Sequence, residues 1–78
     1  MKIEILGPGC KNCQTLEQNT RQALSRLGMA AEVAKVTDMA EIASYGILKT
    51  PGLVIDGEVV MSGRVPAPEA IAGLIRAA

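Results

Sequence analysis

Two cysteines separated by two residues are the feature of this sequence best suited to chemistry. The segment Cys10-Lys11-Asn12-Cys13 follows Gly7-Pro8-Gly9, where a predicted strand gives way to a predicted helix. Cysteines at positions i and i+3 of a first helical turn bring their Cα atoms within the roughly 4.4–6.8 Å that a disulfide requires. Unpaired N–H groups and a partial charge of about +0.5 at a helix N-terminus stabilise a thiolate. The pattern predicts a reversibly oxidised dithiol or a pair of thiolates for a soft metal ion.

The two cysteines are predicted to have different roles. Cys10 follows a glycine at the edge of the loop, where a partner can reach it, whereas Cys13 begins the apolar stripe of the helix. We therefore expect Cys10 to be the nucleophile and Cys13 to be the resolving thiol that attacks the mixed disulfide. Lys11 favours a thiolate at Cys10, although an exposed charge contributes little.

Length and composition predict a single domain over residues 1–78. Apolar residues make up 49% of the chain and Tyr45 is its only aromatic residue, so Ile, Leu, Val, Met and Ala must build the core. Eight basic and eight acidic side chains cancel, which argues against nucleic acid or an anionic membrane as a partner. No apolar run approaches the ~20 residues of a membrane span, and an acid at Glu4 interrupts any signal-peptide pattern. We therefore expect a cytoplasmic monomer. In a reducing compartment such as the cytoplasm, two closely spaced cysteines are redox-active or metal-binding rather than structural.

Local patterns predict seven elements. Strands are expected at 2–6, 31–36, 53–55 and 58–61, the last two joined by the hairpin turn Asp56-Gly57. Helices are expected at 10–27, ended by a Gly28 cap, at 38–45, and from Pro68 onward with Ile71, Leu74 and Ile75 inward. In the second helix Asp38 and Glu41 fit a capping box, and Met39, Ile42 and Ala43 are expected to face inward.

This β-α-β-α-β-β-α order predicts an α/β fold with one mixed sheet. The first two strands flank a helix and are therefore expected to be parallel, through a right-handed crossover. The hairpin then adds two antiparallel strands, so that a four-stranded mixed sheet carries helices on both faces.

Three segments in this order resemble the small two-cysteine thioredoxin-like and glutaredoxin-like proteins of bacteria and archaea, the redox-active disulfide proteins. These segments are Leu6–Cys13, Tyr45–Gly57 and Val60–Arg64. The resemblance implies a thioredoxin-like fold and a thiol–disulfide oxidoreductase that acts on protein or small-molecule disulfides. It implies no bound cofactor, because the cysteine pair carries the electrons, and a reductase partner such as a flavoprotein of the thioredoxin-reductase kind. Gly9 and the Lys-Asn dipeptide depart from the tryptophan and Gly-Pro of thioredoxins, and from the Pro-Tyr common in glutaredoxins.

The resemblance also implies that Thr50-Pro51 is a cis peptide facing the cysteines. The backbone of Thr50 would then pair with an extended substrate segment in a groove beside Cys10. Gly63, which has no side chain, would keep the opposite wall of that groove low. The alternative is an ordinary proline at the first residue of a strand, which is well tolerated.

Glu4 and Tyr45 each have a functional and a structural interpretation. Glu4 lies six residues before Cys10 in a predicted central strand, the offset of the buried acid in thioredoxins. It could accept the proton of Cys13 during resolution, or be an acid near the sheet edge with its carboxylate in solvent. Tyr45 could lie over the active-site end of the sheet and hydrogen-bond near the thiols, or simply pack at the end of a short helix.

Three other functions are compatible with the same residues. Copper-chaperone domains also place a CxxC before their first helix, but run β-α-β-β-α-β and end on a strand, whereas this chain is expected to end on a helix. Structural zinc is disfavoured because two cysteines without histidine cannot fill four ligand positions unless the chain dimerises. The third possibility is a redox-inactive adaptor that uses the groove only to bind peptides. We therefore expect no metal.

Overall fold

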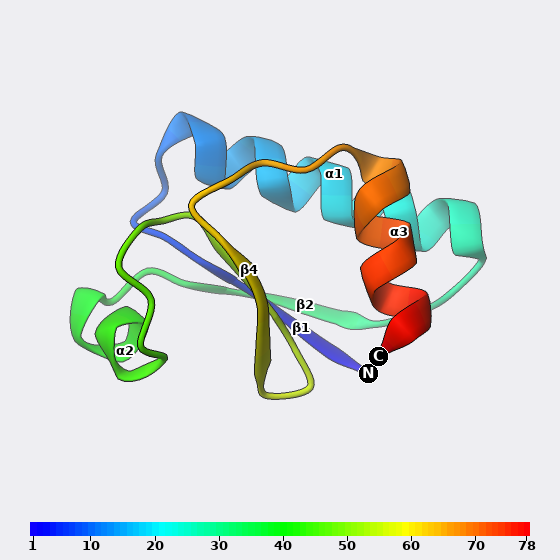
Figure 1. Cartoon of the computed structure of the whole chain (residues 1–78). Helices are drawn as coiled ribbons and strands as arrows, with labels where there is room; N and C mark the ends of the chain where they lie inside the picture. The colour runs from blue at the N-terminus through cyan, green and yellow to red at the C-terminus, as the bar shows by residue number, and fades with distance from the viewer.

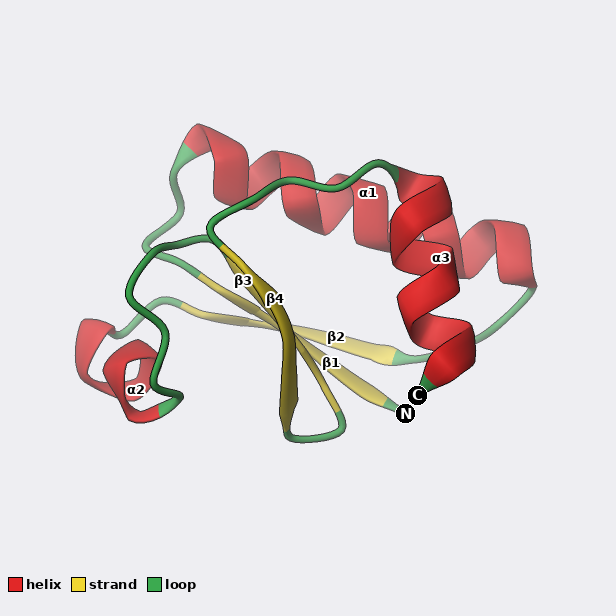
Figure 2. Ribbon diagram, in the orientation of Figure 1, coloured by secondary structure: helices red, strands yellow, loops and turns green.

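The computed structural model describes all residues 1–78, and its seven elements follow the predicted order (Figure 2). They are β1 (Lys2–Leu6), α1 (Lys11–Leu27), β2 (Glu32–Val36), α2 (Met39–Ser44), β3 (Gly52–Ile55), β4 (Glu58–Ser62) and α3 (Pro68–Ala77). None of the helices has the length and apolar character that a bilayer crossing requires.

One four-stranded mixed sheet, of order β2-β1-β3-β4, organises the molecule. The β1 and β2 strands are parallel, as α1 crosses between them, whereas β3 pairs antiparallel with both β1 and β4. The predicted hairpin turn is confirmed, since Asp56 and Gly57 both have positive φ, 49° and 85°. This order leaves β2 and β4 at the edges and buries β1 and β3 between them.

The two faces of the sheet pack against different helices. In Figure 1, α1 and α3 lie together over one face, while α2 lies on the other side of the sheet. Ile3 and Ile5 of β1 belong to the core under α1 and α3, whereas Leu6 packs in a smaller cluster with Ile42 of α2. Because successive strand residues point to opposite faces, Glu4 shares the α2 face and Gly7 continues the α1 face.

Local signals account for the length of α1. Cys10 is its N-cap, and Gly28 ends it in the left-handed conformation at φ 65°. The predicted apolar stripe is buried at Cys13, Leu16, Ala23 and Leu24, with Leu27 packed against it. The stripe also includes Thr20, whose hydroxyl donates to the Leu16 carbonyl at 2.8 Å and so is satisfied in the core.

The predictions for α2 were partly wrong. Ile42 is buried as expected, but Met39 is 58% exposed and Ala43 is exposed too. A helix of six residues turns only one narrow edge toward the sheet, and Ile42 occupies it. The capping box does not form, because Asp38 Oδ1 accepts from the backbone N–H of Ala40 rather than from that of Glu41.

Candidate active site

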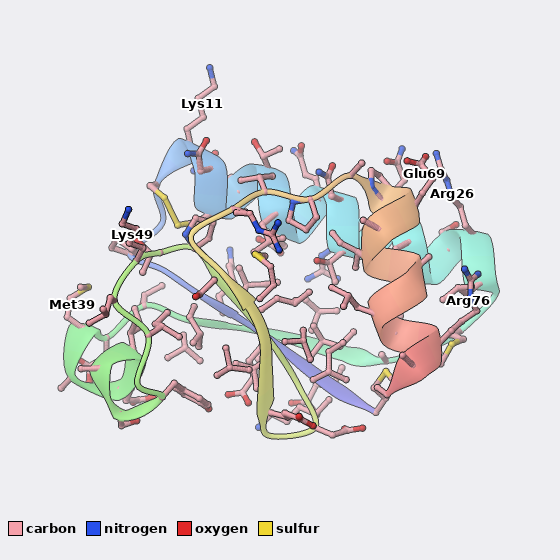
Figure 3. The ribbon with its side chains drawn as sticks, viewed as in Figure 1. Lys11, Arg26, Met39, Lys49, Glu69 and Arg76 are labelled. Carbon is pink, nitrogen blue, oxygen red and sulfur yellow. A yellow bond between two sulfur atoms is a disulfide. The ribbon has the colours of Figure 1, made fainter.

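The cysteine pair lies at the N-terminal end of α1 and is joined as a disulfide (Figure 3). Its Cα atoms are 5.0 Å apart, within the range that a disulfide bridges. Cys10 has extended backbone geometry (φ −67°, ψ 168°), and its Sγ accepts the backbone N–H of Cys13 at 3.2 Å. The sulfur of Cys10 thus occupies the N-cap position, where the helix offers unpaired donors to negative charge.

The two sulfur-bearing residues differ in exposure, as the sequence predicted. Cys10 is exposed, whereas Cys13 is only 5% exposed. Figure 3 shows Lys11 extending from the start of α1 away from the disulfide, and Lys49 on the loop before β3. A partner can therefore reach one cysteine of the pair and not the other.

Gly7 is a residue of the site whose role the sequence did not reveal. Its place in Gly7-Pro8-Gly9 predicts only a turn, yet a Cβ on Gly7 would overlap Cys13 Sγ. The same Cβ would lie 3.9 Å from Cβ of Thr50. The end of β1, the first turn of α1 and the segment before β3 therefore meet at this point, and the missing side chain of Gly7 leaves room for the buried sulfur.

The Thr50-Pro51 peptide is cis, as the resemblance implied, and lies at the same end of the sheet as the cysteines. The carbonyl of Pro51 accepts the backbone N–H of Gly63 at 2.8 Å. Gly63 has φ 76°, and a Cβ there would come 3.3 Å from Cβ of Lys49. The β3–β4 hairpin thus returns Gly63 to the side of Pro51, next to Thr50 in the chain.

Glu4 and Tyr45 contact one another rather than the cysteines. The Tyr45 hydroxyl donates to Glu4 Oε2 at 2.9 Å. This bond, partial burial and the negative charges of Glu4 and Glu41 together raise the pKa of Tyr45 above 10.0. Both residues are half-buried on the α2 face of the sheet, whereas Cys13 lies on the α1 face.

The α1 helix itself supplies a carboxylate on the face of the sheet where Cys13 lies. Glu17, one turn after Cys13, lines a small pocket of about 110 Å³ together with Cys13 and Lys35. Its side chain is 17% exposed and lies 3.6 Å from Lys35 Nζ on β2. The sequence patterns did not identify Glu17, although its i, i+4 spacing from Cys13 places both side chains on one face of the helix.

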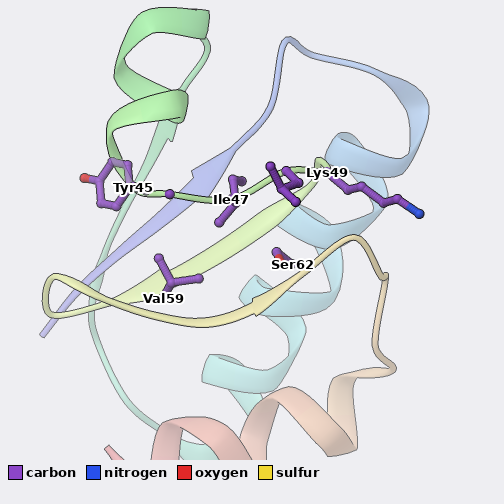
Figure 4. Close-up of a pocket in the computed structure, with 7 residues that line it drawn as sticks. Tyr45, Ile47, Lys49, Val59 and Ser62 are labelled. Atoms are coloured by element: carbon purple, nitrogen blue, oxygen red, sulfur yellow. The ribbon is translucent and has the colours of Figure 1, made fainter.

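A second, more open depression adjoins the Thr50-Pro51 segment. It has a volume of about 480 Å³ and is lined by Tyr45, Ile47, Lys49, Val59 and Ser62 (Figure 4), with Gly46 and Leu48 completing it. Leu48 is 99% exposed. Leu48 lines this depression and presents its apolar side chain to solvent.

The structure contains no group of three or more His, Cys, Asp or Glu side chains arranged to hold a metal ion. The α2 helix lies between β2 and β3, so the element order differs from the β-α-β-β-α-β of copper-chaperone domains.

Known proteins match this chain over almost its whole length. The family model described as a thioredoxin domain matches residues 1–76. A thioredoxin of Methanothermobacter thermautotrophicus is 48% identical over 71 residues, which cover 91% of this chain and 92% of the relative. A thioredoxin of Methanocaldococcus jannaschii is 41% identical over 69 residues, 88% of this chain and 79% of the relative. With its disulfide-linked CxxC pair at the start of α1, the chain belongs to the thioredoxin family and is a thiol–disulfide oxidoreductase.

Proposed function

We propose that this chain exchanges its dithiol with disulfides of other proteins, Cys10 attacking first and Cys13 resolving. The Cys10 thiolate attacks one sulfur of the substrate disulfide, so a Cys10–substrate bond forms and the first substrate sulfur leaves as a thiolate. Cys13 then loses its proton and attacks Cys10 Sγ. The internal disulfide forms, and the second substrate sulfur leaves with the bonding electron pair. The substrate has gained two electrons, and its two thiolates take up protons to replace those released when Cys10 and Cys13 ionised.

The observation that carries these roles is the unequal exposure of the two cysteines. Cys10 is open to solvent at the N-cap of α1, where its sulfur accepts a backbone N–H, while Cys13 is buried behind it. An attacking thiol must be accessible and thiolate-stabilised, and a resolving thiol needs only to reach Cys10.

The proposed substrate site is the segment that faces the cysteines. The backbone of Thr50 pairs with an extended stretch of substrate, Pro51 and Gly63 form the floor and low wall, and Tyr45 borders the adjoining depression. The oxidised protein is returned to the dithiol by a reductase, a flavoprotein of the thioredoxin-reductase kind. We further propose that the chain acts as a cytoplasmic monomer without a bound cofactor.

A trapping experiment tests the order of attack. With Cys13→Ser, Cys10 still attacks but nothing resolves the product, so mixed disulfides with a model protein disulfide such as insulin should accumulate. Cys10→Ser is the matched control and should form no adduct at a comparable rate. Adducts that form only through Cys13 would reverse the assigned roles. A protein that forms no internal disulfide on mild oxidation, yet binds Cu(I) stoichiometrically, would favour the metal-carrier alternative.

A further inference from the structure

We propose that Glu17, rather than Glu4, accepts the proton of Cys13 when the mixed disulfide is resolved. This inference rests on the proposed function, since it concerns the second of its two steps. Cys13 is only 5% exposed, so bulk water and its bases have restricted access to the sulfur. A base that receives this proton must therefore lie on the same side of the sheet as the sulfur and close to it.

Glu4 does not lie on that side. Ile5 of β1 lies on the α1 face, and so does Gly7, the residue after β1, where a Cβ would overlap Cys13 Sγ. Glu4 alternates with them and its carboxylate accepts the hydroxyl of Tyr45 at 2.9 Å on the opposite face. The backbone of the central strand therefore separates the Glu4 carboxylate from the buried sulfur.

Glu17 faces the same pocket as the buried sulfur. The pocket of about 110 Å³ is lined by Cys13, Glu17 and Lys35, with Gln14 and Thr37 as further polar groups. A water molecule occupies about 30 Å³ in the liquid and needs two to four polar partners, so the pocket can hold a short chain of water. Such a chain can carry a proton from Cys13 to the carboxylate.

The charges around Glu17 leave one of its oxygens available. Arg21, one turn further along α1, donates from Nε and Nη2 to Oε2 at 3.2 and 3.1 Å. Oε1 accepts no hydrogen bond from the protein and lies 3.6 Å from Lys35 Nζ. Lys35 is opposite Ile5 in the β1–β2 register, which places it on the α1 face. Arg21 and Lys35 are the cations that face this carboxylate, and they hold it beside the pocket.

The proposed step balances without a further reactant. The Cys13 proton passes through pocket water to Glu17 Oε1, and the resulting thiolate attacks Cys10 Sγ. The bond between Cys10 and the substrate breaks, and the substrate sulfur leaves as a thiolate. Glu17 then returns the proton to that thiolate or to solvent and is ionised again.

The test separates the two steps with an aromatic disulfide, DTNB, added to the reduced protein. Attack by Cys10 releases one coloured thiolate, and resolution by Cys13 releases the second. Glu17→Gln should leave the first release unchanged and slow the second on the order of 10²-fold near neutral pH, the scale of general-base catalysis. The pH profile of the second release should move to alkaline values, because hydroxide must replace the carboxylate.

Glu69→Gln is the matched control, since Glu69 also pairs with an arginine, Arg26, but on the outer surface between α1 and α3. In Glu69→Gln the rate of the second thiolate release should match that of the unaltered protein. In Glu17→Ala, added formate should accelerate the second release, because a small carboxylate can enter the space left by the side chain.

Three results would overturn the proposal. The second release is unchanged in Glu17→Gln, or it is slowed by Glu4→Gln instead, or it is slowed in Glu17→Ala without any rescue by formate. The last result would assign Glu17 a structural role only. Failure of the first release in the unaltered protein would instead contradict the proposed function, so the two failures are distinguishable.

Discussion

Gly7→Ala tests whether the buried sulfur is held against the end of β1. A Cβ at this position overlaps Cys13 Sγ and comes 3.2 Å from Cys13 Cβ. In the oxidised protein the bond to Cys10 prevents the sulfur from moving away. We expect the oxidised form to lose about 1–3 kcal/mol of unfolding free energy, as overpacked cores do. That is a large share of the ~4–12 kcal/mol typical of a chain of 78 residues.

The reduced form should lose less. Once the disulfide is broken, the Cys13 thiol can rotate to another rotamer, and only the contact with its Cβ remains. If the two forms differ by about 1 kcal/mol, the reduction potential rises by roughly 20 mV, since 1.4 kcal/mol corresponds to about 30 mV for two electrons. The sign is positive because the substitution destabilises the oxidised form more.

Urea unfolding of both redox forms, together with equilibration in glutathione buffers, measures these two quantities. Gly73→Ala is the control, because Gly73 lies inside α3 and a Cβ there meets no atom within 4 Å. It should stabilise both forms equally, by up to about 1 kcal/mol, and leave the potential unchanged. Equal losses in both forms of Gly7→Ala, or none in either, would refute the reasoning.

Three further predictions follow from the packing and the charges. The raised pKa of Tyr45 means that the folded state holds the phenol proton more tightly than the unfolded state does. The contribution of Tyr45 to folding stability should therefore be fully present below pH 10.0 and be lost as the pH rises through the folded pKa. Ultraviolet titration of this single aromatic residue checks it, and Glu4→Gln should bring the midpoint back toward 10.0. The Arg26 guanidinium, hydrogen-bonded to Glu69, and a backbone hydrogen bond hold the pKa of Glu69 below 4.5. The contribution of ionised Glu69 to folding stability is therefore present above pH 4.5 and is lost as the pH falls through the folded pKa. In a plot of the urea unfolding midpoint against pH, Glu69→Gln should make the decline on the acid side less steep. Finally, Ile42→Ala should cost about 2–5 kcal/mol in urea unfolding, because Ile42 is 3% exposed and is the one buried contact of α2; a loss below 1 kcal/mol would show that α2 is not anchored there.

The sequence alone predicted the elements and the reactive pair, because the signals for both are local. Gly28 requires a left-handed backbone, Asp56-Gly57 requires positive φ at two successive positions, and the CxxC spacing brings two sulfurs together within one helical turn. The unequal exposure of Cys10 and Cys13 followed from the position of the apolar stripe on α1. Each of these features depends on residues only a few positions apart.

Which groups surround the buried sulfur was decided only by the tertiary structure. Glu4 has the same spacing from Cys10 as the buried acid of thioredoxins. However, the alternation of side chains along β1 turns Glu4 toward Tyr45, on the face of the sheet opposite to Cys13. Glu17 approaches Lys35 because the crossover from β1 to β2 lays α1 across both strands, and no local pattern contains that information. The role of Gly7 depends in the same way on how closely α1 approaches the sheet. Spacing determines which side chains share a face of one element, whereas the order of strands and the hand of the crossover determine what lies opposite them.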